Sequence, residues 1–457
     1  MRARLIALFI RVRESYWLIP AAMALAAFGL SVLCVYLDTW LGSEWFKDVP
    51  WLHANEPEGG RAMLSTIAGS VISVAGVTFS ITIAALSLAS SQYGPRLIAG
   101  FMKDRGNQFV LGTYTATFIY CLLVLRTIQS TQDGEFVPQL SILVGLLLAI
   151  LSVGVLIYFI NHVSQSIRAS HVIHQVSLSL DKRIDNLLLQ PGQPAHAVDG
   201  GKRLDVPEDF DDSAVRIRAP RPGYVQALDV ETLMDMMTSR NLVAQVQARP
   251  GDFVINGGEL VRIAGEGADG RELGSKLQGS FVLGNRRTDT QDALYLMQQL
   301  VEVAARAISP GINDPNTAIT CIDWITAAMS RIAIEYFPSA YRYDDAGVLR
   351  LVYEPVEFSE FVDAVYNPLR QYGREMVEIN VRLLQSIEAI GHHALNPDHR
   401  VLLRRHARCI HADAMAHLPN ADDRDRVEHQ YRTTMQSVTR DGRSEGMAGD
   451  TLPRLPW

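Results

Sequence analysis

Residues 62–95 read AMLSTIAGSVISVAGVTFSITIAALSLASSQYGP and carry no charged side chain. A bilayer core is ~30 Å thick and is crossed by roughly 20 mainly apolar residues in a helix. Wholly helical, this stretch of roughly 34 residues would extend about 50 Å. The sequence therefore predicts a membrane-spanning helix that must tilt, kink or project from the bilayer. Pro95 is expected to end or kink it, because proline removes a backbone hydrogen bond.

Three more segments are long and apolar enough to span. Together with the first they predict spans at about residues 15–37, 62–94, 106–127 and 136–161. Each is expected to be a helix, because an isolated strand would leave backbone groups unpaired in lipid. The first is too long for a cleavable signal peptide and is followed by further spans. The expected fold class is thus membrane α-helical, with a four-helix transmembrane domain over 1–163.

Basic residues predict how these spans are oriented. They gather before the first span, after the second and after the fourth: Arg2, Arg4, Arg11, Arg13, Arg96, Lys103, Arg105, Arg168, Lys182 and Arg183. Short loops rich in Lys and Arg stay in the cytoplasm. The N-terminus and the large C-terminal part are therefore predicted to be cytoplasmic. The net charge of −7 argues against a nucleic-acid partner.

Small and hydroxyl residues recur in the second span with a 4-3-4-3 spacing, which places them on one helical stripe. The stripe consists of Thr66, Ser70, Ser73, Val77, Ser80, Ala84, Ser87 and Ser91. Ile67, Val71, Val74, Ile81 and Leu88 are expected on the opposite face. One interpretation is close helix packing, which small residues permit. The other is a hydroxyl-lined pore formed by one such helix from each subunit of a ring.

Asp, Glu, Lys and His are absent from the middle of all four predicted spans. This argues against a proton-driven transporter, which usually needs intramembrane carboxylates or histidines. Arg126 near the outer end of the third span is the only interruption. It is either an interfacial arginine whose side chain reaches the headgroups or a charge that attracts anions at an extracellular mouth.

The remaining chain divides by composition. A helical extension and a linker rich in Pro and Gly occupy 164–213, and alternating short strands predict a small β module over 214–283. Two Pro-Gly turns, each followed by an apolar strand, resemble biotinyl and lipoyl carrier domains. No lysine occurs from Asp205 to Leu273, so a carrier of a lysine-linked group is excluded. Residues 284–435 are expected to be mainly helical, with a hairpin turning at 345–347, and 436–457 to be a disordered tail.

Two arginines precede a predicted helix at 291–308. Arg286 and Arg287 could bind an anion at its N-terminus, which Thr288 or Asp289 would cap. The alternative is a structural turn in which the arginines pair with Asp289 and with Asp292.

The loop Ser309-Pro310-Gly311-Ile312-Asn313-Asp314-Pro315 follows that helix. Asp314 as the cap and Pro315 at the first position predict the start of the next helix. Asn313 and Asp314 could contact a ligand, or the loop could join two helices or two subunits. A Walker motif does not occur in the sequence. No catalytic residue is predicted, and the protein is not expected to be an enzyme.

Metal ligation has little support in the sequence. The four cysteines form no CxxC pair, so neither a disulfide framework nor a cysteine-rich zinc site is expected. A single helical face carries His406, Cys409, Asp413 and His417, but an amphipathic polar helix produces this spacing by chance. We expect no metal and no cofactor.

Several motifs resemble one family, predicted bacterial integral membrane proteins with a domain of unknown function. They are Ser73–Pro95, the Asp104-Arg105-Gly106-Asn107-Gln108-Phe109 run, Arg287-Thr288-x-x-Gln291-Asp292 and the 309–315 loop. The resemblance covers nearly the whole chain except the tail. It implies location in the bacterial inner membrane and assigns no activity.

The sequence leaves two functional hypotheses. In the first, the protein is a homo-oligomeric ion channel. Its copies form a cyclic ring in which the second span of each lines the pore for the permeating ions, and its cytoplasmic part is an assembly or regulatory domain. In the second, the spans only anchor a sensor or scaffold, whose cytoplasmic part binds a partner or a small anionic ligand. In both, the lipid bilayer is a partner.

Overall fold

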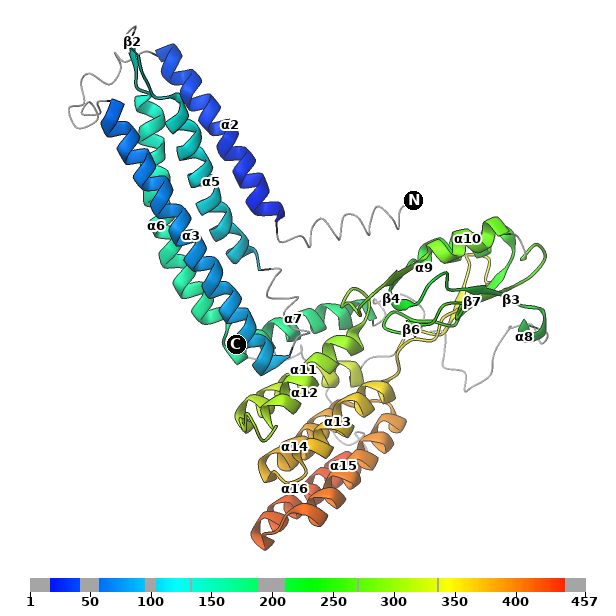
Figure 1. The fold of residues 1–457 in the computed structure, drawn as a ribbon. Coiled ribbons are helices and arrows are strands. Elements are labelled where there is room, and N and C mark those ends of the chain that lie inside the picture. The colour runs from blue at the N-terminus through cyan, green and yellow to red at the C-terminus, as the bar shows by residue number, and fades with distance from the viewer. Residues whose placement is uncertain are drawn as a thin grey trace, which may run out of the picture. The chain divides into compact units, whose positions relative to one another are not determined.

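The computed structural model describes residues 17–41, 57–94, 104–131, 134–187, 210–268, 271–334 and 337–439 (Figure 1). The chain forms two compact units. The N-terminal unit comprises Arg4–Val172, and the C-terminal unit comprises Ile173–Trp457 with Met1–Ala3. Pro95 and the 440–457 part of the predicted tail lie outside the described residues.

Four long helices build the N-terminal unit. They are α2 (Leu18–Leu41), α3 (Pro57–Tyr93), α5 (Arg105–Thr127) and α6 (Gln139–Ser166). They correspond to the four predicted spans and run side by side in Figure 1. Helix α5 packs against the other three, and a short antiparallel hairpin, β1 (Gln129–Thr131) with β2 (Gly134–Phe136), joins α5 to α6.

Polar contacts tie together the end of this unit that carries the β1–β2 hairpin. Asp38 of α2 accepts hydrogen bonds from the backbone N–H groups of Leu140 and Ser141, both at 2.9 Å, and from the Ser141 hydroxyl at 2.6 Å. Its carboxylate therefore caps the start of α6 from another helix. The Tyr120 hydroxyl donates to the carbonyl of Ser141, and Arg61 donates to that of Ile128.

Five helices of the described residues are long and apolar enough to cross a membrane. Four are α2, α3, α5 and α6. The fifth, α12 (Pro315–Ile334), belongs to the C-terminal unit, where it packs against α11 and α14. Two of its charged residues make ion pairs within that unit, Asp323 with Arg382 and Arg331 with Asp181.

The C-terminal unit begins with α7 (Ala169–Leu187), which starts at the end of the N-terminal unit, and α8 (Phe210–Ser213). A β module follows. Its strands are β3 (Val215–Arg218), β4 (Gly223–Leu228), β5 (Val243–Val246), β6 (Phe253–Val254), β7 (Glu259–Ala264) and β8 (Phe281–Gly284). Helices α9 (Val230–Arg240) and α10 (Arg271–Gly279) accompany them.

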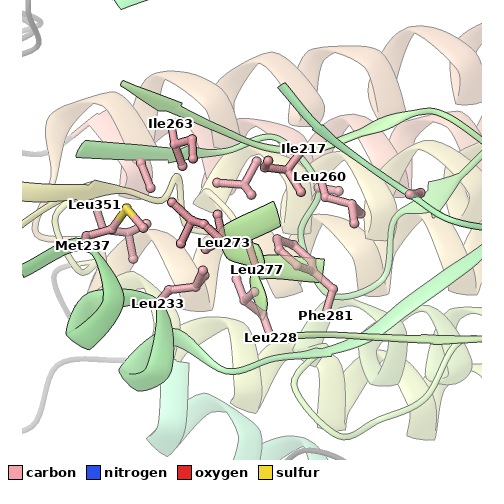
Figure 2. Close-up of a cluster of buried hydrophobic side chains, with 14 of the residues drawn as sticks. Ile217, Leu228, Leu233, Met237, Leu260, Ile263, Leu273, Leu277, Phe281 and Leu351 are labelled. Carbon is pink, nitrogen blue, oxygen red and sulfur yellow. The ribbon is translucent and has the colours of Figure 1, made fainter. Parts of the chain in front are cut away.

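The predicted hairpin belongs to this β module. Its strands β9 (Tyr341–Tyr343) and β10 (Leu349–Val352) complete a five-stranded sheet of order β3-β7-β5-β10-β9, in which β10 pairs parallel to β5. A second sheet has the order β6-β4-β8. Leu351 of β10 lies in the same buried cluster as Leu233 and Ile263 (Figure 2). A strand from within the region predicted to be mainly helical therefore completes the β core.

The rest of the C-terminal unit is a helical bundle, comprising α11 (Ala293–Ala307), α12, α13 (Phe358–Gly373), α14 (Val377–His393), α15 (Pro397–His417) and α16 (Ala421–Thr439). Helix α16 continues four residues into the predicted tail, because Val438 is buried against Gly391. Arg249 of the β module joins the bundle through two hydrogen bonds to Glu360, at 2.9 and 2.7 Å.

Candidate functional site

Helix α3 presents two distinct faces. Its buried face consists of Leu64, Ala68, Val71, Ala75, Thr78, Ala85 and Ala89, and helix α3 packs against α5 and α6. All eight residues of the predicted stripe are exposed. The apolar side chain of Val77 is itself 59% exposed. The stripe thus faces away from the neighbouring helices of its own unit. The expectation for the opposite face was wrong for Ile81 and Leu88, which are also exposed and flank the stripe.

The stripe hydroxyls bond to their own helix. Thr66 donates to the carbonyl of Ala62 at 2.7 Å, and Ser80 donates to that of Gly76 at 2.9 Å. The Ser73 hydroxyl likewise donates to a backbone carbonyl one turn earlier in its own helix. These bonds use the hydroxyl hydrogen and leave the oxygen lone pairs as acceptors. The stripe therefore presents weakly polar acceptors on a face that its own unit does not cover.

Arg126 is exposed near the C-terminal end of α5. It makes no ion pair with any residue that the structure describes. Both interpretations of this arginine, an interfacial anchor and a charge at a mouth, remain compatible with that position.

A polar group at the other end of α5 was not predicted. Asp104 caps α5 by accepting from the N–H of Gly106 at 2.8 Å, and its second oxygen lies 2.5 Å from Nε2 of His162 on α6. The His162 ring stacks on Tyr158, with centroids 5.3 Å apart. A Cβ at Gly106 would lie 2.6 Å from Nε2 of His162, so a larger residue there would force the His162 ring to shift. The Asp104–Phe109 run resembles a motif of the family, but His162 lies 58 residues away from Asp104.

Asn107 belongs to the same turn of α5. It is 4% exposed, and neither of its side-chain polar atoms has a hydrogen-bond partner within the described residues. Buried amides are nearly always paired. The N-terminal end of α5 therefore combines a paired carboxylate with an amide that has no hydrogen-bond partner among the described residues.

Arg287 is fully engaged within the C-terminal unit. Its guanidinium donates to Asp292 at 2.6 and 3.0 Å and to Gln298 at 2.8 Å, and it lies 5.2 Å from the centre of the Tyr295 ring. Asp292 is 3% exposed, and burial raises the pKa of its carboxyl, although Arg287 opposes the shift. This arrangement agrees with the second of the two interpretations of Arg287, a structural turn in which the arginine pairs with Asp292. Arg286 is exposed beside it.

The helix cap at this position differs from the prediction. Asp292, rather than Thr288 or Asp289, caps α11 by accepting from the N–H of Tyr295 at 2.9 Å. The helix starts later than expected, because Asp292 is fixed at the same time by Arg287. One buried carboxylate thus joins the preceding turn to α11.

The 309–315 loop connects α11 and α12. Asp314 accepts from the N–H and the hydroxyl of Thr317, at 3.1 and 2.6 Å, which confirms the predicted cap. Asn313 is exposed and has a positive φ of 51°, a conformation that asparagine tolerates better than most residues. Ile312 beside it is exposed as well. The loop is a helix connector whose tip faces solvent.

The histidine-rich helices contain no group of three metal-ligating side chains within the described residues. His406 is buried with Nε2 2.9 Å from Asp363, and burial lowers its pKa. Asp413 instead pairs with Arg370, and His417 contacts its own helix at the carbonyl of Asp413. These three side chains of the predicted face therefore make structural contacts.

Comparison with known proteins places this architecture in a family. A family model described as "Predicted membrane protein (DUF2254)" matches residues 13–389, which include the four N-terminal helices, the β module and most of α14. The chain belongs to this family. It is therefore a membrane protein with several apolar helices, as the motif resemblance implied.

Relatives within the family share most of the chain. Uncharacterized proteins of Mycobacterium bovis and of Mycobacterium tuberculosis are each 28% identical over 391 residues, which cover 84% of this chain and 74% of the relative. No solved structure matches.

Proposed function

We propose that this family member is a homo-oligomeric ion channel of the bacterial inner membrane, in which α3 of each subunit lines the pore. The observation that carries the proposal is the exposure of all eight stripe residues on α3. Hydroxyl oxygens with free lone pairs are suited to solvating ions or water. A neutral lining of this kind would discriminate weakly between cations and anions.

Several subunits are needed for such a pore. One chain supplies one stripe, and its own α5 and α6 cover the other face of α3. A closed cyclic ring of copies would enclose the stripe and give each subunit the same contacts. Small residues at Ser73, Gly76 and Ala84 would also let neighbouring α3 helices approach closely.

The proposed orientation follows the arginines and lysines. Their distribution supports a cytoplasmic N-terminus and a cytoplasmic C-terminal unit, with four spans between them. Helix α12, although long and apolar, is assigned to the cytoplasmic bundle because Asp323 and Arg331 pair with other residues of that bundle and of α7.

The test is ion flux through full-length protein reconstituted in liposomes and planar bilayers, with K⁺ and Cl⁻ gradients. We expect single-channel currents that Ser80→Leu strongly reduces. The matched control is Ser164→Leu, because Ser164 is an exposed serine of α6 that makes an equivalent bond to the carbonyl of Ile160, at 2.8 Å. Equal loss in both variants, or no flux under tension, voltage or pH change, would contradict the proposal.

Absence of flux together with a stoichiometric cytoplasmic partner in pull-downs would instead favour a membrane-anchored scaffold. Cross-linking separates the two functions further. Ser73→Cys is expected to form α3–α3 disulfides between copies, whereas Ser164→Cys on α6 is not. A protein that stays monomeric in a bilayer has no pore of the proposed kind.

A further inference from the structure

Two large apolar side chains project from one end of the β module. Phe253 of β6 is 57% exposed, and Ile255, which follows β6, is 66% exposed. The Phe253 ring packs edge-on against Tyr224 of β4, with centroids 5.0 Å apart. Together with Arg218 and Arg221 they form a surface that we call the 253–255 tip. Its apolar side chains are absent from the buried core shown in Figure 2.

The tip is held in a fixed conformation. The N–H of Gly258 donates to the carbonyl of Ile255 at 3.0 Å, which closes a tight turn. Gly257 adopts a positive φ of 77°, and two backbone bonds with Ala219, at 2.9 and 2.7 Å, attach the turn to the segment after β3. Ile255 is therefore exposed by a defined backbone.

Neither arginine at this tip forms an ion pair with a carboxylate among the described residues; Arg218 acts on Glu259 only through a longer-range attraction, which helps to lower the pKa of that carboxyl. Arg218 donates to the carbonyl of Gly257 at 3.4 Å, and Arg221 donates to that of Leu283. Glu259, the register partner of Arg218 across β3 and β7, forms its ion pairs with Arg262 and with Arg216, at 2.7 and 3.2 Å. Two guanidinium charges thus flank two exposed apolar side chains.

We propose that the 253–255 tip binds the headgroup surface of an anionic membrane, with Phe253 and Ile255 entering the interface and Arg218 and Arg221 contacting lipid phosphates. Exposed apolar side chains beside basic ones are what an interfacial surface needs. Arginine matches phosphate geometry well. The chain also carries its own apolar membrane helices, so a lipid surface is always present at high effective concentration.

The test uses a fluorophore in the full-length protein. Ile255→Cys is made in a Cys409→Ser background, because the other three cysteines, Cys34, Cys121 and Cys321, are buried. The label is bimane, and the protein is reconstituted in vesicles of phosphatidylcholine with or without phosphatidylglycerol. Lipids with a doxyl quencher near the headgroup report contact. The matched control is Val348→Cys, an apolar residue of the same unit, 43% exposed, in the β9–β10 turn beside Asp344.

We expect doxyl lipids to quench the label at 255 in anionic vesicles and to leave the label at 348 unquenched. Arg218→Gln combined with Arg221→Gln should weaken the contact about 30-fold, or about fivefold for each arginine. Added salt should weaken it as well. Three results would overturn the proposal. They are equal quenching at both positions, quenching that changes neither with lipid charge nor with loss of both arginines, and protection of the label at 255 by another protein copy rather than by lipid.

Discussion

Replacing Asp38 with alanine removes a carboxylate that stabilises the start of a different helix. In the native protein it accepts three hydrogen bonds at the first turn of α6, two from backbone N–H groups and one from the Ser141 hydroxyl. Helix α2 and helix α6 are joined at this end through that side chain, although about a hundred residues separate them.

The expected cost follows from those three bonds. Loss of an N-cap side chain costs ~1 kcal/mol, and hydrogen bonds to a charged group contribute ~1.5–3 kcal/mol each where water is excluded. Asp38 is only half-buried, so water recovers part of the loss. We therefore expect Asp38→Ala to lower the free energy of opening of this end of the unit by roughly 2–4 kcal/mol.

Cys34 provides the assay. It is 4% exposed and lies one helical turn before Asp38 on α2. A thiol reagent can label it only when the α2 contact opens. In full-length protein in detergent, with labelled peptides measured by mass spectrometry, Asp38→Ala should raise the labelling rate of Cys34 about 30- to 1,000-fold.

Two variants control this experiment. Asp38→Asn keeps one acceptor oxygen and should give an intermediate rate. Thr39→Ala removes an exposed hydroxyl that bonds only to the carbonyl of Tyr36 in its own helix, so it should change the rate little. A rate for Asp38→Ala within twofold of the native protein, or below that of Asp38→Asn, would refute the capping argument.

Three further predictions concern the C-terminal unit and are checked by thermal denaturation of the full chain. Burial lowers the pKa of His399, so the unfolded state binds the proton more readily and stability falls as pH drops through about 6.5. His399→Phe should reduce the loss of Tm between pH 7 and pH 5; an unchanged loss contradicts this. Gly251→Ala should cost about 1–2 kcal/mol or more, because φ is +102° and the added Cβ would press on Asp292. Glu360→Gln should cost about 1–2 kcal/mol by breaking the pair with Arg249, and a loss that salt leaves unchanged would argue against an ionic origin.

Local features of the sequence were sufficient for the N-terminal helices. Long runs without charge predicted all four, since lipid excludes ionisable side chains and unpaired backbone. The 4-3-4-3 spacing also predicted that the stripe residues of α3 share one face, because a helix places such positions together whatever its neighbours are. It did not predict whether that face would be packed or exposed. The assignment of Ile81 and Leu88 to the opposite face failed because these residues lie beside the stripe.

Contacts between distant residues were not predictable in this way. The first span was predicted to end at about residue 37, just before Asp38, yet Asp38 lies in α2 and caps α6. His162 meets Asp104 only because α5 and α6 pack together. The parallel pairing of β10 with β5 brings Leu351 to Ala244, and no local pattern of alternation specifies a partner strand about a hundred residues away.

In the proposed channel, the α3 stripe lines water in an assembly of several copies. Cysteine accessibility in the reconstituted full chain measures whether it does. Cysteines at Ser73, Ser80 and Ser87 should react with a charged, membrane-impermeant thiol reagent, and their modification should block ion flux. Cysteines at the exposed apolar positions Ile72, Phe79 and Ile83 of the same helix should stay unreactive. Equal reactivity at both sets, or an unreactive stripe, would contradict the claim.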